Sequence, residues 1–259
     1  MDKSPILFHR AGRVICWRCP LLYRVFGLIR HHGDCLSGAY DAWIGGYPRS
    51  ANTFSAAAFR LANPQVRLAT HFHIPPFVIN AVRLKKPGIF LVRPPEDTVA
   101  SLTIYWKGKV KSEDCLDHYL DFYRIMAPYI SSLFVAPFDV VTRDFGKVIE
   151  GLNDRFGTRF CALPHDGKMV SECFSRIEEV APVEDDGSPD ESIIHRPSTL
   201  RQELKPTVLR DLRSSRKASA KPEEAKELYS AFSQAPSRAS LPHAPPPNPV
   251  QFPAGAEVA

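Results

Sequence analysis

The chain has 259 residues, a net charge of +5, and apolar and charged fractions of 44% and 24%, as in ordinary globular proteins. This length can bury the core of one large α/β domain or of two small ones. The modest positive charge favours anionic ligands and gives no reason to expect a nucleic-acid partner. Six cysteines in so long a chain argue against a disulfide scaffold.

We treat residues 1–39 as an N-terminal extension. Arginines interrupt each of its apolar runs, so no signal peptide is predicted. Nothing in the chain approaches the roughly 18 uninterrupted apolar residues of a membrane span. We therefore predict a cytoplasmic protein without a membrane span. The extension is basic and amphipathic, which favours a helix docked on the main domain and leaves contact with a membrane surface as the alternative.

Four residues of this extension have a spacing close to that of small zinc modules: Cys16, Cys19, His32 and Cys35. Residues 21–29, which separate the two pairs, instead carry the apolar spacing of a buried helix. Zinc binding therefore stays an alternative, and we predict no metal site.

Residues 40–232 alternate strand-like and helical segments, which predicts one α/β domain with a central parallel β-sheet and helices on both of its faces. Compact apolar runs predict strands at 42–44, 65–74, 88–92 and 134–141. Apolar residues at helical spacing predict helices at 77–84, 98–106, 114–133, 144–156 and within 200–232. Pro128 should split the third of these helices, and Gly157 should cap the fourth.

Two further segments lack periodicity. The acidic stretch 180–192 contains proline and glycine and is predicted to be a loop or lid. Residues 233–259 are rich in proline and alanine, which predicts a disordered tail. We expect pocket walls to come from loops such as 106–114 and 173–192.

Residues 43–63 combine a short apolar run, a Gly-Gly pair, the turn Tyr-Pro-Arg-Ser-Ala-Asn-Thr and a helix start that Pro64 limits. The backbone N–H groups of such a turn and the positive end of the helix dipole both face an anion. Arg49 adds a positive charge, while Ser50, Asn52 and Thr53 add side-chain donors. We interpret this stretch as a phosphate-binding loop; a plain turn that caps an ordinary helix is the alternative.

A second motif follows the strand predicted at 88–92. This strand ends in Arg93, and Ser101 lies eight residues later on the next helix. Open α/β sheets bind ligands at the carboxyl ends of their strands, where an arginine can hold a phosphate through two hydrogen bonds. The alternative is that Arg93 pairs with Glu96 or Asp97 and that Ser101 faces solvent.

These motifs resemble those of one enzyme family. The loop GYPRSANTF resembles the YPKSGTTW or YPRSGNTW loop of sulfotransferases that use 3′-phosphoadenosine 5′-phosphosulfate (PAPS). The Gly-Lys-Ser/Thr close of a Walker loop is absent. Arg93 with Ser101 resembles the second motif of this family, and Thr70-His71 resembles its Lys-Thr-His-Leu-Pro segment. The resemblance covers roughly residues 40 to 205 and implies a P-loop-NTPase-like sulfotransferase fold.

The resemblance also implies a role for each matched residue. Arg49 would neutralise charge on the bridging oxygen as the S–O bond breaks, and Arg93 with Ser101 would hold the 3′-phosphate. His71 would be the catalytic base, with His73 as the alternative. The residues implied in donor binding by the loop are Arg49, Ser50, Ala51, Asn52, Thr53 and Phe54, the last by stacking on adenine.

The chain departs from the family pattern at three places. Ala51 replaces a glycine, which would strain the loop if this position needs a positive φ. Ala69 replaces the lysine before the Thr-His pair. The C-terminal Arg-Lys-Gly-x-x-Gly-x-Trp-Lys loop, which closes over the 3′-phosphate, has no match. The substitute that we predict is the segment His195-Arg196-Pro197-Ser198 with Arg201 and Lys205; a solvated basic helix is the alternative.

The resemblance thus implies transfer of a sulfuryl group from PAPS to an acceptor hydroxyl or amine, in line and without a required metal. The expected partners are the nucleotide donor and an unidentified acceptor. Two alternatives remain: a nucleoside-phosphate kinase or hydrolase of related P-loop fold, and a catalytically silent nucleotide-binding protein.

Overall fold

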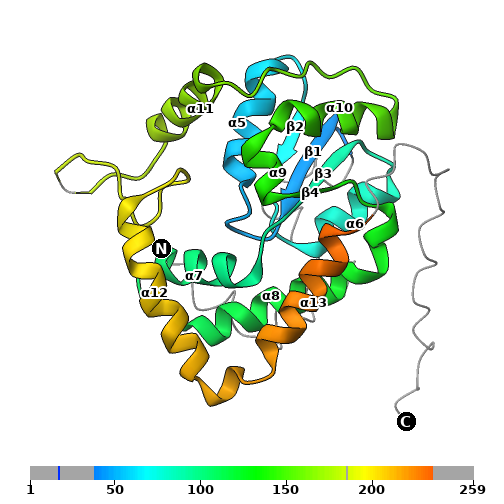
Figure 1. The fold of residues 1–259 in the computed structure, drawn as a ribbon. Helices are drawn as coiled ribbons and strands as arrows, with labels where there is room; N and C mark the ends of the chain where they lie inside the picture. The colour runs from blue at the N-terminus through cyan, green and yellow to red at the C-terminus, as the bar shows by residue number, and fades with distance from the viewer. Residues whose placement is uncertain (1–16, 18–37, 185, 236–259) are drawn as a thin grey trace, which may run out of the picture.

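The computed structural model describes residues 17, 38–184 and 186–235 (Figure 1). Its centre is a parallel sheet of four strands in the order β2-β1-β3-β4. The strands are β1 (Ala42–Gly46), β2 (Leu68–Thr70), β3 (Gly88–Val92) and β4 (Val135–Pro137). The predicted α/β fold with a central parallel sheet is confirmed.

The central strands read as continuous apolar runs because both faces of the sheet are covered. All five residues of β1 and all five of β3 are buried. In the register of the sheet, Ile44 pairs with Ile89 of β3 on one side and with Thr70 of β2 on the other. Successive side chains then enter two different apolar clusters.

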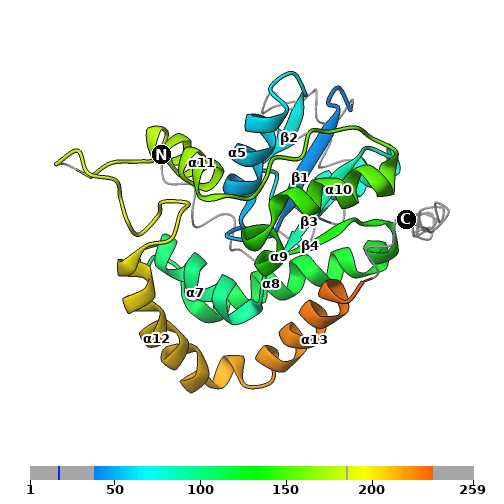
Figure 2. The same cartoon turned by 45° about the horizontal axis from the view of Figure 1, so that its top comes forward.

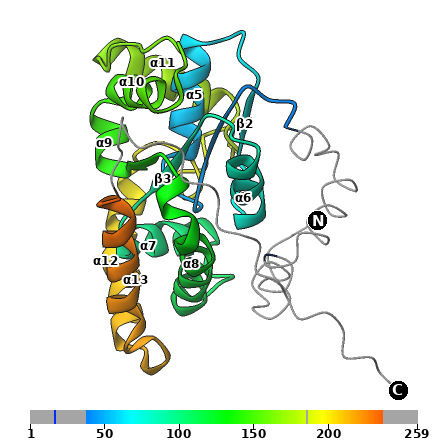
Figure 3. The same ribbon diagram turned by 90° about the vertical axis from the view of Figure 1, so that its right-hand side faces the viewer.

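One cluster lies between the sheet and α5 (Asn52–Ala62), α10 (Phe145–Phe156) and α11 (Gly167–Glu179), and it takes Ile44 and Leu91 from the strands. The second cluster takes Trp43 and Phe90 and lies on the opposite face. Its helices are α6 (Pro75–Arg83), α7 (Pro95–Tyr105), α8 (Ser112–Met126), α12 (Thr199–Ser214) and α13 (Lys221–Ser233). Figures 1 and 3 show these two groups of helices on either side of the strands.

The last two long helices return along helices that come earlier in the chain. α12 packs on α7, and α13 packs on α8. Figure 2 shows this pair as an outer bracket around α7 and α8. The bracket brings the residues near position 200 back to the sheet, whose strands all lie within residues 42–137.

The strand predicted at 134–141 is wrong in its second half. β4 ends at Pro137, and residues 138–143 form the helix α9 (Phe138–Arg143). A proline has no N–H for the next ladder bond, and its fixed φ suits the position before a helix. The strand predicted at 65–74 is likewise short, because His71 with φ of +65° ends β2.

The helix predictions hold with small shifts at the ends. Pro128 splits the predicted long helix into α8 and the 3₁₀ helix η1 (Ala127–Ser132). Asp144 caps α10 at its start, and Gly157 with φ of +66° caps its end. The region predicted as helical after 200 holds α12, η2 (Arg216–Ala218) and α13. The prediction of a loop at 173–192 missed α11, which extends to Glu179.

Of the N-terminal extension before position 38, the structure describes Trp17 alone. Its buried ring lies with its centroid 5.0 Å from that of His118. The four candidate zinc ligands Cys16, Cys19, His32 and Cys35 and the predicted tail from 236 onward lie outside the described residues. Within the described part of the chain, no helix is long and apolar enough to cross a membrane, and no three potential ligands gather for a metal.

We expect Gly88→Ala to lower the free energy of unfolding by about 2 kcal/mol or more. A Cβ at this position would lie 2.1 Å from the indole ring of Trp43 on the neighbouring strand, in the middle of the sheet. Chemical denaturation of the wild type and the variant measures the loss.

The matched control is Gly167→Ala in the first turn of α11. A Cβ there meets nothing within 4 Å. This variant should unfold within about 0.5 kcal/mol of the wild type. Equal stability of the Gly88→Ala variant and this control would contradict the packing argument.

Candidate functional site

A cleft of about 770 Å³ lies at the carboxyl edge of the sheet. Residues that follow each of the four strands line it: Arg49 after β1, His71 after β2, Arg93 after β3 and Phe138 after β4. This volume is typical of sites for small molecules. The cleft also lies where open α/β folds bind their ligands, because the chain leaves β1 for one face of the sheet and leaves β2 for the other.

Buried polar contacts hold the loop between β1 and α5 in place. Tyr47 is fully buried and donates its hydroxyl hydrogen to the carbonyl oxygen of Cys115 at 3.1 Å. Asn52 donates from Nδ2 to the carbonyl oxygen of Tyr47 at 3.0 Å, and Ser50 is fully buried. Arg49, Ala51 and the start of α5 line the cleft above. Of the predicted donors, Asn52 therefore builds the loop, whereas the buried hydroxyl of Ser50 has no hydrogen-bond partner among the described residues.

The backbone of this loop has an unusual conformation. Arg49 and Ala51, two residues apart, have φ of +67° and +65°. Alternation through the left-handed region turns successive N–H groups to one side of the chain, which is the backbone arrangement of concave anion sites. The first N–H groups of α5 have no partner within the helix and add to it. The sequence analysis expected Ala51 to strain the loop if this position needs a positive φ, and φ is positive there.

Arg49 reaches across the cleft to two other parts of the chain. Its Nε donates to Oγ of Ser101 on α7 at 3.1 Å, while Nη1 and Nη2 donate to the carbonyl oxygens of Ile193 and Ile194 at 3.0 and 3.1 Å. The guanidinium also lies 5.3 Å from the ring centroid of Tyr105. Burial and nearby positive charge lower the pKa of Arg49 to about 9, so the group stays protonated at pH 7.

Arg93 lies beside the loop at the end of β3. Its Nη1 donates to the carbonyl oxygen of Arg49 at 2.8 Å, and its guanidinium stacks 4.1 Å from the ring centroid of Phe138. Its buried Nε has no hydrogen-bond partner among the described residues. Burial lowers the pKa of Arg93. The predicted alternative, an ion pair of Arg93 with Glu96 or Asp97, does not form.

A third arginine, Arg201 near the start of α12, lines the same cleft. It donates from Nη1 to the carbonyl oxygens of Glu191 and Ile194, both at 2.8 Å, and from Nη2 to that of Arg196. Its positive charge lowers the pKa values of both Arg49 and Arg93. None of these three arginines forms an ion pair with a carboxylate of the described residues. The hydrogen bonds of these arginines thus go to uncharged groups, while the carboxylates of Asp97 and Glu191 act on Arg93 and Arg201 without forming an ion pair with them.

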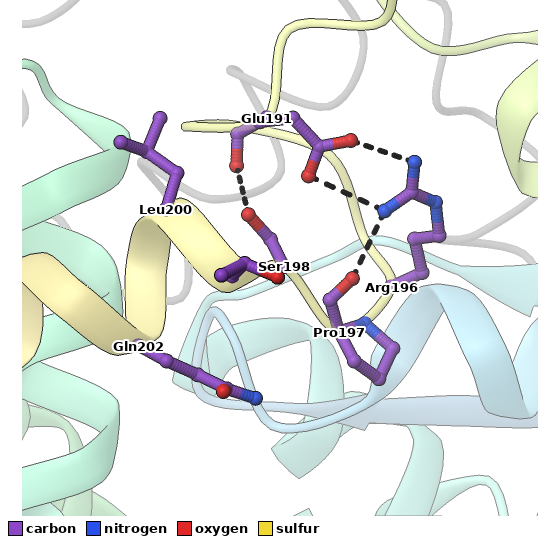
Figure 4. A pocket seen from close by; sticks show the side chains of 7 residues that line it. Glu191, Arg196, Pro197, Ser198, Leu200 and Gln202 are labelled. Carbon is purple, nitrogen blue, oxygen red and sulfur yellow. Dashed lines mark hydrogen bonds and ion pairs between the residues drawn. The ribbon is translucent and has the colours of Figure 1, made fainter.

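Arg196 and Lys205, predicted to help in closing the site, are arranged differently. Arg196 lines the cleft, but it pairs with Glu191 at 2.6 Å and with Glu178. Figure 4 shows its guanidinium turned onto the Glu191 carboxylate, in a second pocket of about 400 Å³. Lys205 pairs with Asp97. The positive charges of both residues are thus already neutralised.

His71 and His73 lie side by side at the end of β2, with ring centroids 6.1 Å apart. His71 is exposed, has φ of +65° and makes no hydrogen bond within the described chain. Partial burial and the charge of Arg60 lower its pKa. His73 is held by a 3.0 Å hydrogen bond between Nδ1 and the carbonyl oxygen of Gly46, and burial lowers its pKa to about 4. Both imidazoles are neutral at pH 7, and the carbonyl of Gly46 requires the proton of His73 on Nδ1.

Two aromatic groups complete the cleft walls. The ring of Phe54 is buried and packs near Phe174, His165 and Phe145, with centroid distances of 5.9, 6.0 and 6.3 Å. Tyr105 and Trp106 form a second aromatic wall beyond Arg49. His195 faces Tyr105 across the cleft, with ring centroids 6.4 Å apart.

The sequence analysis did not single out Phe138, His165 or Phe174 as site residues. Phe138 alone carried a usable signal, since it follows a strand, and the incorrect assignment of residues 138–141 to that strand concealed it. His165 lies more than 100 residues after the loop, and no local pattern connects it with the loop. Phe174 falls within the stretch 173–192, which was expected to supply pocket walls, but nothing in that stretch marked this residue.

Comparison with known proteins was made by sequence and by structure. No family model matches the chain, and no curated protein matches its sequence at a significant level. Among solved structures, the chain is similar to mouse sulfotransferase SULT7A1 in complex with PAP. The match has 12% sequence identity and a TM-score of 0.39, and it covers 71% of this chain and 89% of the mouse chain. At this level it supports no conclusion about this chain.

We expect Ala51→Gly to raise the free energy of unfolding by about 1 kcal/mol, because glycine adopts a positive φ without the steric conflict of a Cβ. Chemical denaturation measures the change. Ala57→Gly, in the middle of the same helix α5, is the control and should lower stability by about 1 kcal/mol. The same sign of change in both variants would contradict the assignment of strain to Ala51.

We also expect the protein to lose stability as the pH falls from 6.5 toward 4. An unfolded chain protonates His73 near pH 6.5, whereas the folded protein keeps it neutral down to about pH 4. The contribution of neutral His73 to the free energy of unfolding is therefore fully present above pH 6.5, and about 3 kcal/mol of it is lost by pH 4. Denaturation at several pH values measures this slope. The free energy of unfolding should fall less steeply with decreasing pH in His73→Gln than in the wild type. Parallel curves for the two proteins would contradict the assignment of this loss to His73.

Proposed function

We propose that this chain is a sulfotransferase that moves a sulfuryl group from PAPS to an acceptor hydroxyl or amine. The main support for this proposal is a pair of cations at the ends of adjacent strands, Arg49 after β1 and Arg93 after β3. Both line one cleft, and neither forms an ion pair with a carboxylate of the described residues. Together with the resemblance of the loop to that of PAPS-dependent enzymes, this pair favours a nucleotide with more than one anionic group.

The donor set suits such a nucleotide. The positive-φ turn and the start of α5 offer backbone N–H groups to one phosphate. Arg93 lines the cleft and gives Nη1 to the uncharged carbonyl oxygen of Arg49, so its positive charge can act on a second anionic group. Ser101 accepts a hydrogen bond from Arg49, so its own hydroxyl hydrogen is available to a second phosphate. We propose Arg49, Ala51, Thr53, Phe54, Arg93 and Ser101 as the donor-binding residues in contact with the nucleotide, with Ser50 and Asn52 shaping the loop.

In the proposed reaction, the acceptor hydroxyl gives its proton to His71 while its oxygen forms a bond to sulfur. The bond between sulfur and the bridging phosphate oxygen breaks, and its electron pair stays on that oxygen. Arg49 stabilises the negative charge that develops there, because it is a cation held in place before the reaction. The balance of this transfer needs no metal.

His71 is our choice for the base because its ring is exposed to the cleft, neutral, and not engaged in a hydrogen bond within the described chain. His73 is the alternative, since its bond from Nδ1 to Gly46 leaves Nε2 as the acceptor nitrogen. The acceptor is not specified by this proposal.

A thermal-shift titration with adenosine 3′,5′-bisphosphate, beside ATP–Mg²⁺ and 5′-AMP, tests the proposal. A specific ligand at about 100 times its dissociation constant should add about 2.7 kcal/mol, or a few degrees for a domain of this size. The bisphosphate should stabilise the protein most. A larger shift with ATP–Mg²⁺ would favour a kinase or hydrolase. No shift with any of the three would count against a nucleotide site.

The same titration on Arg93→Ala should show affinity for the bisphosphate reduced about tenfold or more, because a charged hydrogen bond is lost. Arg83→Ala, which removes an exposed arginine at the end of α6, is the control and should bind as the wild type does. Unchanged affinity in Arg93→Ala would remove Arg93 from the proposed site. Sulfation of any acceptor in a mixed extract would exclude a silent binding protein.

A further inference from the structure

We propose that Trp17 is a positioning residue for the loop between β1 and α5, and that it acts through His118 and Tyr47. These three side chains form a buried contact path from the N-terminal extension to the start of the loop. The effect on the loop follows from these contacts alone, whereas the effect on nucleotide affinity rests on the proposed function.

The indole ring of Trp17 packs against α8. Trp17 is 6% exposed, and its ring centroid lies 5.0 Å from that of His118 and 6.0 Å from that of Phe122. Both pairs are edge-on, with interplanar angles of 63° and 83°. Edge-to-face pairs of buried rings stabilise a structure beyond the apolar area that they bury. Trp17 therefore restricts how the imidazole of His118 can turn.

His118 holds Tyr47 through a buried hydrogen bond. Its Nδ1 lies 2.8 Å from the hydroxyl oxygen of Tyr47, whose hydrogen goes to the carbonyl oxygen of Cys115 at 3.1 Å. The hydroxyl oxygen therefore accepts from His118, which places a proton on Nδ1. His118 and Cys115 are three residues apart on α8 and share one of its faces. Because His118 and Tyr47 are both buried, loss of this bond would cost more than it would at the surface.

Tyr47 in turn fixes the first part of the loop. Its backbone carbonyl oxygen accepts a hydrogen bond from Nδ2 of Asn52 at 3.0 Å, which joins the two ends of the turn. Between them lie the positive φ values of Arg49 and Ala51. Backbone in such conformations keeps its geometry only where surrounding contacts fix it. The hydrogen bonds that attach Tyr47 to α8 are contacts of this kind, and Trp17 supports them through the imidazole.

This path ends at the cleft. His118, Arg49 and Ala51 line it, whereas Trp17 does not. Packing at Trp17 can therefore act on the cleft without a contact between Trp17 and a ligand. Removal of the indole would leave a space beside His118, and water that enters it would compete with the Tyr47 hydroxyl for Nδ1. The loop would then leave its observed conformation more often.

Hydrogen–deuterium exchange of the full chain, followed by mass spectrometry, tests the effect on the loop. In Trp17→Ala, the amides of residues 49–53 should exchange at least about threefold faster than in the wild type, because the loop opens more often. Trp17→Phe keeps an aromatic ring beside the imidazole and should restore most of the protection.

Phe156→Ala is the control for this experiment. It removes a half-buried ring of α10 from the cluster on the opposite face of the sheet, and the loop should exchange as it does in the wild type. Equal acceleration in all peptides of Trp17→Ala would indicate a general loss of stability and would overturn the inference. Unchanged exchange of the loop in Trp17→Ala would overturn it as well.

Titrations with adenosine 3′,5′-bisphosphate test the effect on the cleft. Trp17→Ala should weaken binding about fivefold, which is the loss expected when one buried hydrogen bond no longer supports the site. In a Tyr47→Phe background, which already lacks the hydroxyl, Trp17→Ala should weaken binding less than about twofold further. Fully additive losses would overturn the path through Tyr47. If the wild type does not bind the bisphosphate, the proposed function fails, and the exchange experiment alone decides the role of Trp17.

Discussion

The mutual repulsion of three arginines is the constraint around which the cleft is built. Arg49, Arg93 and Arg201 come from three separate parts of the chain, and the fold brings them together without acidic partners from the described residues. Their hydrogen bonds go to backbone carbonyls and to one serine hydroxyl. Such contacts hold each side chain in place while leaving the positive charge available. The arrangement suits recognition of anions more than it suits stability, because an acid at any of these places would relieve the repulsion.

The same preference for binding over stability is visible in the backbone. Five non-glycine residues of the described chain have positive φ values, and three of them, Arg49, Ala51 and His71, line the cleft after strand ends. Such conformations cost about 1 kcal/mol or more each for residues with a side chain, and they persist where the surrounding structure fixes them. Here the buried hydrogen bonds of Tyr47 and Asn52 hold the loop in place. Three of the five strained positions in the described chain therefore lie on the surface that would meet a ligand.

Much of this site could be predicted from short stretches of sequence. Arg49 and Arg93 were found because each follows an apolar strand, and parallel strands place their carboxyl ends at one edge. The ion pairs of Arg196 could not be predicted in this way. They join Arg196 to Glu178 and Glu191, and only the tertiary structure shows this pairing. The helix at 138–143 was missed for a related reason, since its valines have the composition of a strand and the break at Pro137 decides the outcome.

The hydrogen bonds from Arg49 to the carbonyl groups of Ile193 and Ile194 join a segment that is synthesised early to one that is synthesised late. All four strands lie within residues 42–137, so every strand is synthesised before the last third of the protein. The partners of Arg49 on that segment appear more than 50 residues after β4 ends. One face of the sheet likewise waits for late residues, since Phe90 of β3 packs near Phe232 of α13. A chain that stops before residue 193 therefore lacks both the carbonyl groups that hold Arg49 and the helix that covers Phe90.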